Sequence, residues 1–217
     1  MIDRGITLQI DGKRLGATLS VPPAAHGLVI FAHGSGSSRH SPRNRFVAAS
    51  LNEAGIATLL LDLLTDDEEE IDRRTATLRF DIALLARRMD LATVWSREQS
   101  ELRAFRIGYF GASTGAGAAL LAASTRDDVD AIVSRGGRPD LAGDALPDIT
   151  APTLLVVGEL DPKVIDLNRR AASQYQAHCE IAIVPGATHL FEEPGTLEQV
   201  AQLAQDWFVR YLAAPAA

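Results

Sequence analysis

The chain has 217 residues, of which 47% are hydrophobic and 23% charged, an ordinary composition for a globular protein with a sizeable core. Its 28 acidic and 21 basic side chains give a net charge of −7, which argues against a nucleic-acid-binding surface. The single cysteine excludes an internal disulfide, and the lack of both a secretory pattern and a ~20-residue apolar stretch predicts a cytoplasmic protein without membrane contact.

The chain opens on a predicted β-hairpin, because two apolar-rich segments flank Asp11-Gly12, a pair typical of a two-residue turn. The segments that follow include continuous apolar runs, as expected for strands buried on both faces. These runs cover residues 27–32, 56–62, 106–111 and 153–158. Residues 131–134 and 180–184 are shorter strand candidates.

Between these strands, the spacing of apolar residues predicts helices. The expected helices cover residues 43–54, 75–97, 115–125, 164–176 and 196–212. The acidic run at residues 66–70 is predicted to be a solvated loop or a helix start. Alternation of strands and helices after a hairpin indicates an open, mainly parallel sheet covered by helices on both faces. No linker divides residues 1–217, so we expect a single α/β domain with little or no cap.

Residues 111–115, Gly-Ala-Ser-Thr-Gly, have the G-x-S-x-G spacing of a nucleophile elbow. They follow an apolar strand and precede a helix rich in small residues, which is the context that such a turn requires. The two glycines leave room for a sharp turn that presents Ser113. We therefore predict Ser113 as a nucleophile, although a serine in a turn is more often structural.

A serine hydroxyl needs a base to take its proton. His189 follows the last predicted strand, and Asp161 follows the strand at residues 153–158. The chain order Ser113, Asp161, His189 is the order used by enzymes with this kind of elbow. Each residue alone has ordinary capping or turn roles, but all three at strand ends together predict a Ser-His-Asp triad.

The oxyanion of an acyl-transfer intermediate needs backbone N–H donors, and losing one such donor costs roughly 3–4 kcal/mol of barrier. The amide of Thr114, directly after the nucleophile, is one expected donor. The second is expected from the glycine-containing segment at residues 33–38, His-Gly-Ser-Gly-Ser-Ser, where Ser35 is the candidate. His33 is predicted to fix this loop by hydrogen bonding.

Four segments together resemble the α/β-hydrolase fold, in particular its dienelactone-hydrolase-like branch: HGSGSS, GASTG, VVGELD and PGATHLF. The resemblance covers nearly the whole chain. It implies Ser113 as nucleophile, His189 as general base and acid, and Asp161 as the residue that orients it, with no metal or organic cofactor. Dienelactone hydrolases have a cysteine where Ser113 stands here. This difference favours a general serine hydrolase that acts on a small-molecule ester, thioester or lactone.

Two other functions are compatible with parts of the sequence. Gly111, Gly115 and Gly117 match the glycine spacing of short-chain dehydrogenases, which bind a nicotinamide dinucleotide. Those enzymes place the motif at the first strand and need a Tyr-x-x-x-Lys pair, which this chain lacks. The second of these alternatives is a non-catalytic binding protein of the hydrolase fold, since a fold alone does not establish function.

Two arginines are candidate substrate contacts. Arg135 follows a strand next to the elbow, and Arg39 follows the proposed oxyanion loop. Surface solvation is the ordinary explanation for each arginine. A guanidinium also suits carboxylate and phosphate geometry, so Arg135, together with Arg39, is predicted to receive an anionic part of a substrate.

Overall fold

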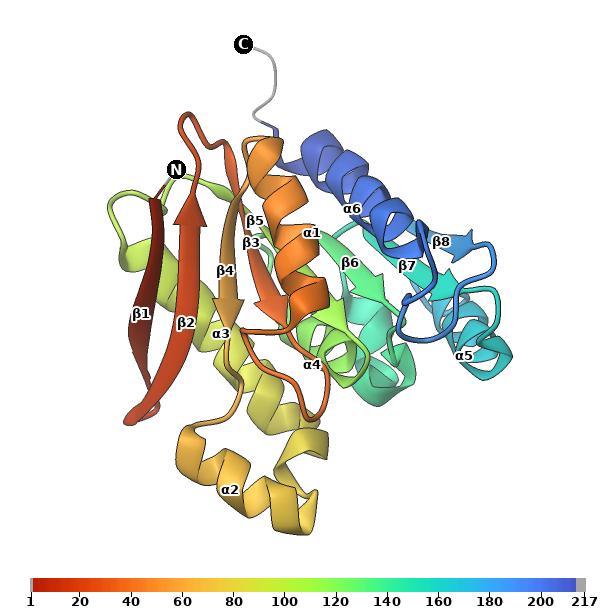
Figure 1. Ribbon diagram of the computed structural model, residues 1–217, viewed down its shortest axis with the longest axis horizontal. Coiled ribbons are helices and arrows are strands. Elements are labelled where there is room, and N and C mark those ends of the chain that lie inside the picture. The colour runs from red at the N-terminus through yellow and green to blue at the C-terminus, as the bar shows by residue number, and fades with distance from the viewer. Residues whose placement is uncertain (1, 214–217) are drawn as a thin grey trace.

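The structure is a computed structural model that describes residues 2–213. Its strands form one sheet in the order β1-β2-β4-β3-β5-β6-β7-β8 (Figure 1). The strands are β1 (Ile2–Ile10), β2 (Lys13–Val21), β3 (Gly27–Ala32), β4 (Ala57–Leu61), β5 (Arg106–Ala112), β6 (Val129–Arg135), β7 (Thr153–Gly158) and β8 (Cys179–Val184). β2 runs antiparallel to β1 and β4, and all other neighbours are parallel. The predicted mainly parallel sheet with an N-terminal hairpin is confirmed.

The local sequence explains the strands. Asp11 and Gly12 have φ values of 51° and 69°, the left-handed pair that a type I′ hairpin turn requires. All residues of β3, β4 and β7 are buried, as expected for aliphatic runs that are covered on both sides.

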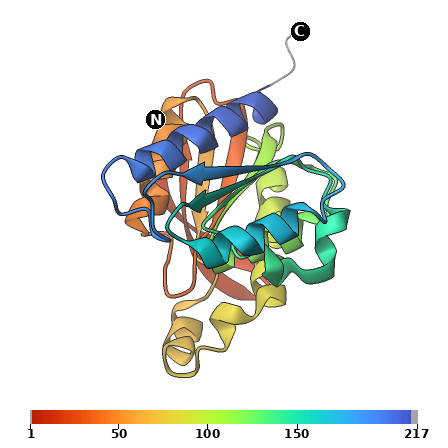
Figure 2. The same ribbon diagram turned by 90° about the vertical axis from the view of Figure 1, so that its right-hand side faces the viewer.

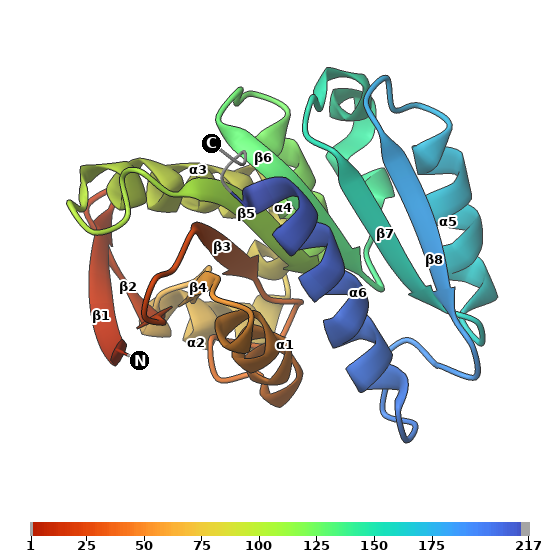
Figure 3. The same ribbon diagram turned by 90° about the horizontal axis from the view of Figure 1, so that it is seen from above.

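The helices cover both faces of the sheet (Figure 3). They are α1 (Pro42–Glu53), α2 (Asp66–Thr75), α3 (Ile82–Glu98), α4 (Thr114–Ala123), α5 (Pro162–Ala172) and α6 (Thr196–Leu212), with 3-10 segments η1 (Leu78–Phe80) and η2 (Pro139–Asp148). Helices α1 and α6 pack on one face, and α3, α4 and α5 supply the core of the other. Figure 2 shows α6 and α5 on opposite sides of β7 and β8.

The connection from β4 to α3 differs from the expected single helix over residues 75–97. Helix α2 ends at Thr75, where Ala76 adopts a left-handed φ of 53°. Helix α3 begins only at Ile82. Asp81 caps this helix, because its side chain accepts a hydrogen bond from the Leu84 amide at 3.0 Å. The acidic run therefore starts a separate short helix. This helix projects beyond the edge at which the parallel strands end, at the bottom of Figure 1.

Candidate active site

The elbow after β5 places Ser113 at the carboxyl edge of the sheet. Ser113 has φ 50° and ψ −119°, a conformation that a residue with a side chain adopts only when its surroundings enforce it. The Ser113 amide donates to the carbonyl of Arg135 on the neighbouring strand at 3.1 Å, which holds the turn in place. Thr114 is the first residue of α4, so its amide has no carbonyl acceptor one turn earlier in the helix.

The two glycines of the motif are needed because the chain passes close to both. A Cβ atom on Gly111 would lie 2.4 Å from Ala116 Cα, and one on Gly115 would lie 2.3 Å from the His33 carbonyl oxygen. Both neighbours are backbone atoms that cannot move without deforming the sheet edge. The glycine pattern is therefore explained by close packing of α4 on the strands, without a dinucleotide.

The structure brings together the three residues that were predicted as a triad. Asp161 follows β7 directly before α5, and His189 lies in the loop between β8 and α6. His189 Nδ1 is 2.7 Å from Asp161 Oδ2, and its Nε2 is 3.3 Å from Ser113 Oγ. The His189 side chain is 37% exposed and that of Asp161 is 17% exposed. The imidazole is thus partly exposed while the Asp161 carboxylate is mostly covered.

The predicted oxyanion loop lies against the elbow. A Cβ atom on Gly34 would be 3.3 Å from both the Ser113 Cβ and the Ala112 carbonyl oxygen. The Gly34 carbonyl accepts a hydrogen bond from the Ser37 amide at 3.2 Å, which closes a tight turn around Ser35. Ser35 itself is exposed. The loop therefore passes next to Ser113 at Gly34, directly before Ser35.

His33 fixes this loop, as the sequence predicted. Burial lowers the pKa of its imidazole below the ordinary value, so the ring is neutral at neutral pH. One ring nitrogen lies 2.9 Å from the Gly34 carbonyl, and the other accepts from the Leu63 amide at 3.0 Å. The Leu63 carbonyl in turn accepts from Arg88, which forms two 2.7 Å hydrogen bonds to Glu68. A chain of polar contacts thus connects the loop to α2 and α3.

The family follows from a comparison with known sequences. The sequence profile of the dienelactone hydrolase family matches residues 15–213. The chain belongs to this family. Two curated proteins of Mycobacterium tuberculosis, each named putative phosphoribosyl transferase, are 59% identical to it over 198 residues, which make up 91% of this chain and 44% of theirs. The chain spans less than half the length of these relatives, so their name describes longer proteins.

Among solved structures, the dienelactone hydrolase of Anabaena variabilis is 55% identical to this chain and superposes with a TM-score of 0.95, over 97% of this chain and 98% of that one. A Bradyrhizobium protein named probable 2-oxo-3-(5-oxofuran-2-ylidene)propanoate lactonase is 27% identical over 191 residues, which correspond to 80% of this chain and 72% of that protein. The predicted α/β-hydrolase fold is confirmed.

The two arginines predicted as substrate contacts lie apart in this dienelactone hydrolase family member. Arg39 forms an ion pair with Asp62, which also accepts from the Arg39 amide at 2.6 Å. Asp62 directly follows β4, whereas Arg135 ends β6, and β3 and β5 lie between them. Arg135 is 7% exposed and forms no ion pair with a described carboxylate. The structure therefore does not bring Arg39 to Arg135.

The residues that do lie near Arg135 come from the first turn of α1. Arg135 Nη2 is 3.5 Å from Asn44 Oδ1, and the charge of Arg43 is close enough to act on the Arg135 guanidinium. The sequence contains no local signal for this contact, because it joins positions 91 residues apart.

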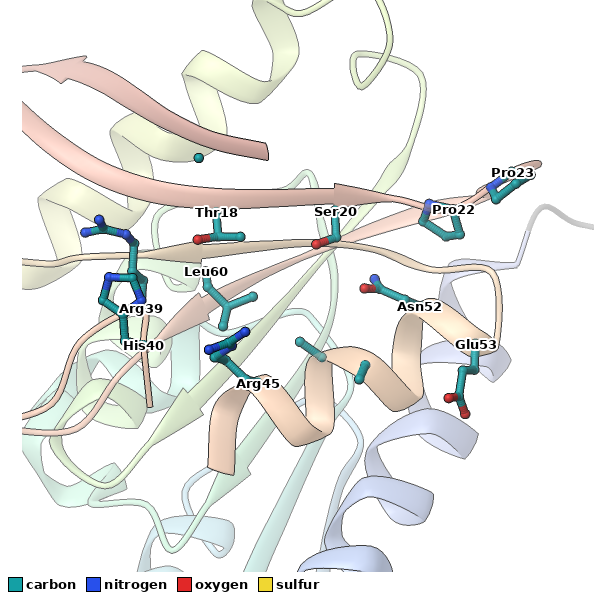
Figure 4. Close-up of a pocket in the computed structure, with 13 residues that line it drawn as sticks. Thr18, Ser20, Pro22, Pro23, Arg39, His40, Arg45, Asn52, Glu53 and Leu60 are labelled. Atoms are coloured by element: carbon teal, nitrogen blue, oxygen red, sulfur yellow. The ribbon is translucent and has the colours of Figure 1, made fainter. Parts of the chain in front are cut away.

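A groove of about 670 Å³ lies between α1 and strands β2 and β4 (Figure 4). Thr18, Ser20, Arg39, His40, Arg45, Asn52 and Glu53 line it together with apolar residues, and Ser113, Asp161 and His189 are not among the residues of this groove. Within residues 2–213, no group of three or more His, Cys, Asp or Glu side chains is placed to hold a metal ion, and no helix is long and apolar enough to span a bilayer.

Proposed function

We propose that the protein is a serine hydrolase that cleaves a carboxylic ester, thioester or lactone through an acyl-serine intermediate. The observation that carries this proposal is the hydrogen-bonded path from Ser113 through His189 to Asp161 at a strained elbow. Backbone strain at a non-glycine residue that also carries a nucleophilic group is typical of functional sites.

In the proposed reaction, Ser113 Oγ attacks the substrate carbonyl while His189 Nε2 takes the hydroxyl proton. The tetrahedral intermediate collapses, and the leaving alcohol, thiol or lactone oxygen departs with that proton. Water then attacks the acyl-serine with His189 as base, which releases the acid and restores the hydroxyl. Asp161 holds the ring with Nδ1 protonated and stabilises the imidazolium that forms in each half-reaction.

The oxyanion of each intermediate would be held by the amides of Thr114 and Ser35. Thr114 begins α4, so the positive end of that helix lies next to the charge that develops. Ser35 is positioned by the tight turn on Gly34 and by the buried His33. All groups in this mechanism come from the chain, and none requires a metal ion or cofactor.

The names of two relatives support an ester-type bond. The Anabaena variabilis protein is named for a dienelactone and the Bradyrhizobium protein for a lactone, and a lactone is a cyclic ester. A serine nucleophile and a partly exposed base suit small substrates of this class. Ester, thioester and lactone hydrolysis share the same machinery, and the shape of the pocket decides between them.

The test is ester turnover and covalent labelling by a fluorophosphonate in the wild type and in Ser113→Ala. We expect the variant to lose labelling and to lower kcat by about 10⁴- to 10⁶-fold. Ser173→Ala is the matched control, because its exposed hydroxyl on the C-terminal end of α5 contacts only the Arg170 carbonyl. Undiminished turnover or labelling in Ser113→Ala would contradict the proposal and favour a non-catalytic binding protein.

A further inference from the structure

The groove between α1 and strands β2 and β4 takes no part in the proposed reaction. Its volume of about 670 Å³ lies within the roughly 300–1,000 Å³ that is typical of small-molecule sites. The side chains of β2 that point into it, Thr18 and Ser20, are small (Figure 4). Gly5 pairs with Thr18 in the sheet, and a Cβ atom there would meet no heavy atom within 4 Å. Small residues on the strands thus keep the groove open.

One end of the groove carries a positive charge. Arg45 is exposed, and its guanidinium points from α1 into the groove, towards Leu60 (Figure 4). It forms no ion pair with a carboxylate in residues 2–213, whereas the neighbouring Arg39 is paired with Asp62. An exposed guanidinium is ordinary by itself, but this one lies over an apolar floor. It therefore presents one free positive charge to a ligand in the groove.

The groove has one carboxylate in its lining, and this group is turned away. Glu53 lies at the other end of α1, and its side chain points away from β2 (Figure 4). A carboxylate that faced the groove would repel an anion and would pair with Arg45 itself. The charge inside the groove is therefore positive.

Between the ends, the floor is apolar, and the far end has a hydrogen-bond acceptor. Leu60 and Ala48 are each 4% exposed. Asn52 points into the groove (Figure 4), and its Nδ2 donates to the Ile56 carbonyl at 2.9 Å and to Thr58 Oγ1 at 3.1 Å. These two bonds fix the amide. Its Oδ1 has no donor among the residues that the structure describes, so it can accept a hydrogen bond from a ligand.

Helix α1 sets the distance between the two polar ends. Arg45 and Asn52 lie on the same helix about two turns apart, which is about 10 Å along its axis. Both ends are fixed by one rigid element, so the groove selects ligands by length. A ligand that reaches both needs an anionic group and a hydrogen-bond donor at opposite ends of an apolar chain.

We propose that this groove is a non-catalytic binding site for an amphipathic carboxylate with a hydroxyl at its other end. The carboxylate pairs with Arg45, the chain lies over Leu60 and Ala48, and the hydroxyl donates to Asn52 Oδ1. A carboxylate suits the site better than a phosphate monoester, because one free guanidinium balances one charge and a phosphate monoester carries about −1.5 to −2. The proposal does not depend on the hydrolase function.

The experiment is a titration of the ¹⁵N-labelled protein with 8-hydroxyoctanoate, followed by amide chemical shifts. We expect saturable shifts at residues 17–20 and 45–53 and none at 111–115 or 188–190. Octanoate lacks the hydroxyl and 1,8-octanediol lacks the charge. We expect octanoate to bind about 2- to 10-fold more weakly and the diol at least about 10-fold more weakly, the ranges for a neutral and a charge-assisted hydrogen bond.

Two variants at exposed positions of α1 test the contacts. Arg45→Met should raise Kd for 8-hydroxyoctanoate about 10-fold and leave Kd for the diol within about twofold. Ala49→Trp places an indole in the groove, which Ala49 lines, and should abolish binding of both. Arg87→Met is the control, because this exposed arginine pairs with Asp11 outside the groove, and it should change neither.

Three results would overturn the site: shifts centred on the elbow or the His189 loop, equal affinity for 8-hydroxyoctanoate and either matched ligand, or no saturable shift in the millimolar range. Retained binding in Ala49→Trp would do the same. None of these results bears on the hydrolase function, which is tested separately by ester turnover in Ser113→Ala.

Discussion

Two buried arginines of this protein have opposite surroundings. Arg88 on α3 is 2% exposed, and Arg135 on β6 is 7% exposed. Arg88 makes two hydrogen bonds to Glu68 and one to the Leu63 carbonyl, so only its Nε lacks a partner among the described residues. Arg135 has one long contact and no described carboxylate. The fold supplies a carboxylate partner for Arg88 and none of the described carboxylates for Arg135, so the two arginines should affect stability differently.

The sharpest test of this comparison is the removal of each charge. Arg88→Met removes both hydrogen bonds from Arg88 to the mostly covered Glu68 carboxylate and leaves only Lys13, at 4.0 Å, as its counter-ion. We expect a loss of about 3–5 kcal/mol in the free energy of unfolding. Arg135→Met removes a charge that has no counter-ion, so stability should be unchanged or higher. Urea denaturation measures both.

Arg87→Met is the matched control for the first variant, because Arg87 neighbours Arg88 in sequence but its side chain is 63% exposed. Its loss should cost at most about 1 kcal/mol. A similar large loss in Arg88→Met and Arg135→Met would show that both arginines are structural.

The second test is the pH dependence of stability. Burial raises the pKa of Glu68, but hydrogen bonds from Arg88 and Thr65 outweigh this effect and lower it from 4.5 to about 2. Because the carboxyl pKa is lower in the folded state than in the unfolded state, the ionised carboxylate stabilises the fold at pH values above 4.5. This contribution is lost as pH falls from 4.5 towards 2. It amounts to about 3 kcal/mol in the wild type.

This acid-dependent loss should be absent from Glu68→Gln, whose side chain does not titrate, when unfolding is measured between pH 5 and pH 2. The wild type and Arg135→Met should share the same slope, because Arg135 has no carboxylate to titrate. An unchanged slope in Glu68→Gln would contradict the assignment of the loss to this pair.

The smallest expected effects come from the residues that cap α2, which pairs with Arg88, and α1, which contacts Arg135. Thr65 caps α2 and Ser41 caps α1, and replacing either with alanine should cost about 1 kcal/mol of stability. Urea denaturation measures both variants, and a loss well above about 1 kcal/mol in either one would contradict a capping role alone.

The sequence predicted most of the fold, and the positions of the three proposed triad residues at one edge of the sheet, for a physical reason. Strand order along the chain places Ser113, Asp161 and His189 at the ends of strands that run in the same direction, so local signals fix their edge of the sheet. The contact between Arg135 and the first turn of α1 could not be predicted, because it depends on which face of the sheet the side chain occupies and on which helix packs there. The ion pair of Arg39 could not be predicted either, because its partner Asp62 lies 23 residues away, directly after β4.

The boundary between α2 and α3 was missed for a related reason. Residues 75–97 have an apolar spacing that suits one helix, but Asp72 accepts hydrogen bonds from the Arg79 amide at 3.0 Å and from its Nε at 2.6 Å. This pair, with Asp72 buried, folds the chain back and stops α2 at Thr75. Helix propensity alone does not indicate such a hydrogen-bonded turn.

The α2 projection is anchored almost entirely by its own neighbours in sequence: Thr65 and Glu68 at its start, Asp72 and Arg79 at its end, and Arg88 on the next helix. Its outer end, at residues 73–77, touches none of the triad residues. Chain length can therefore be added there in a descendant protein without re-forming the elbow.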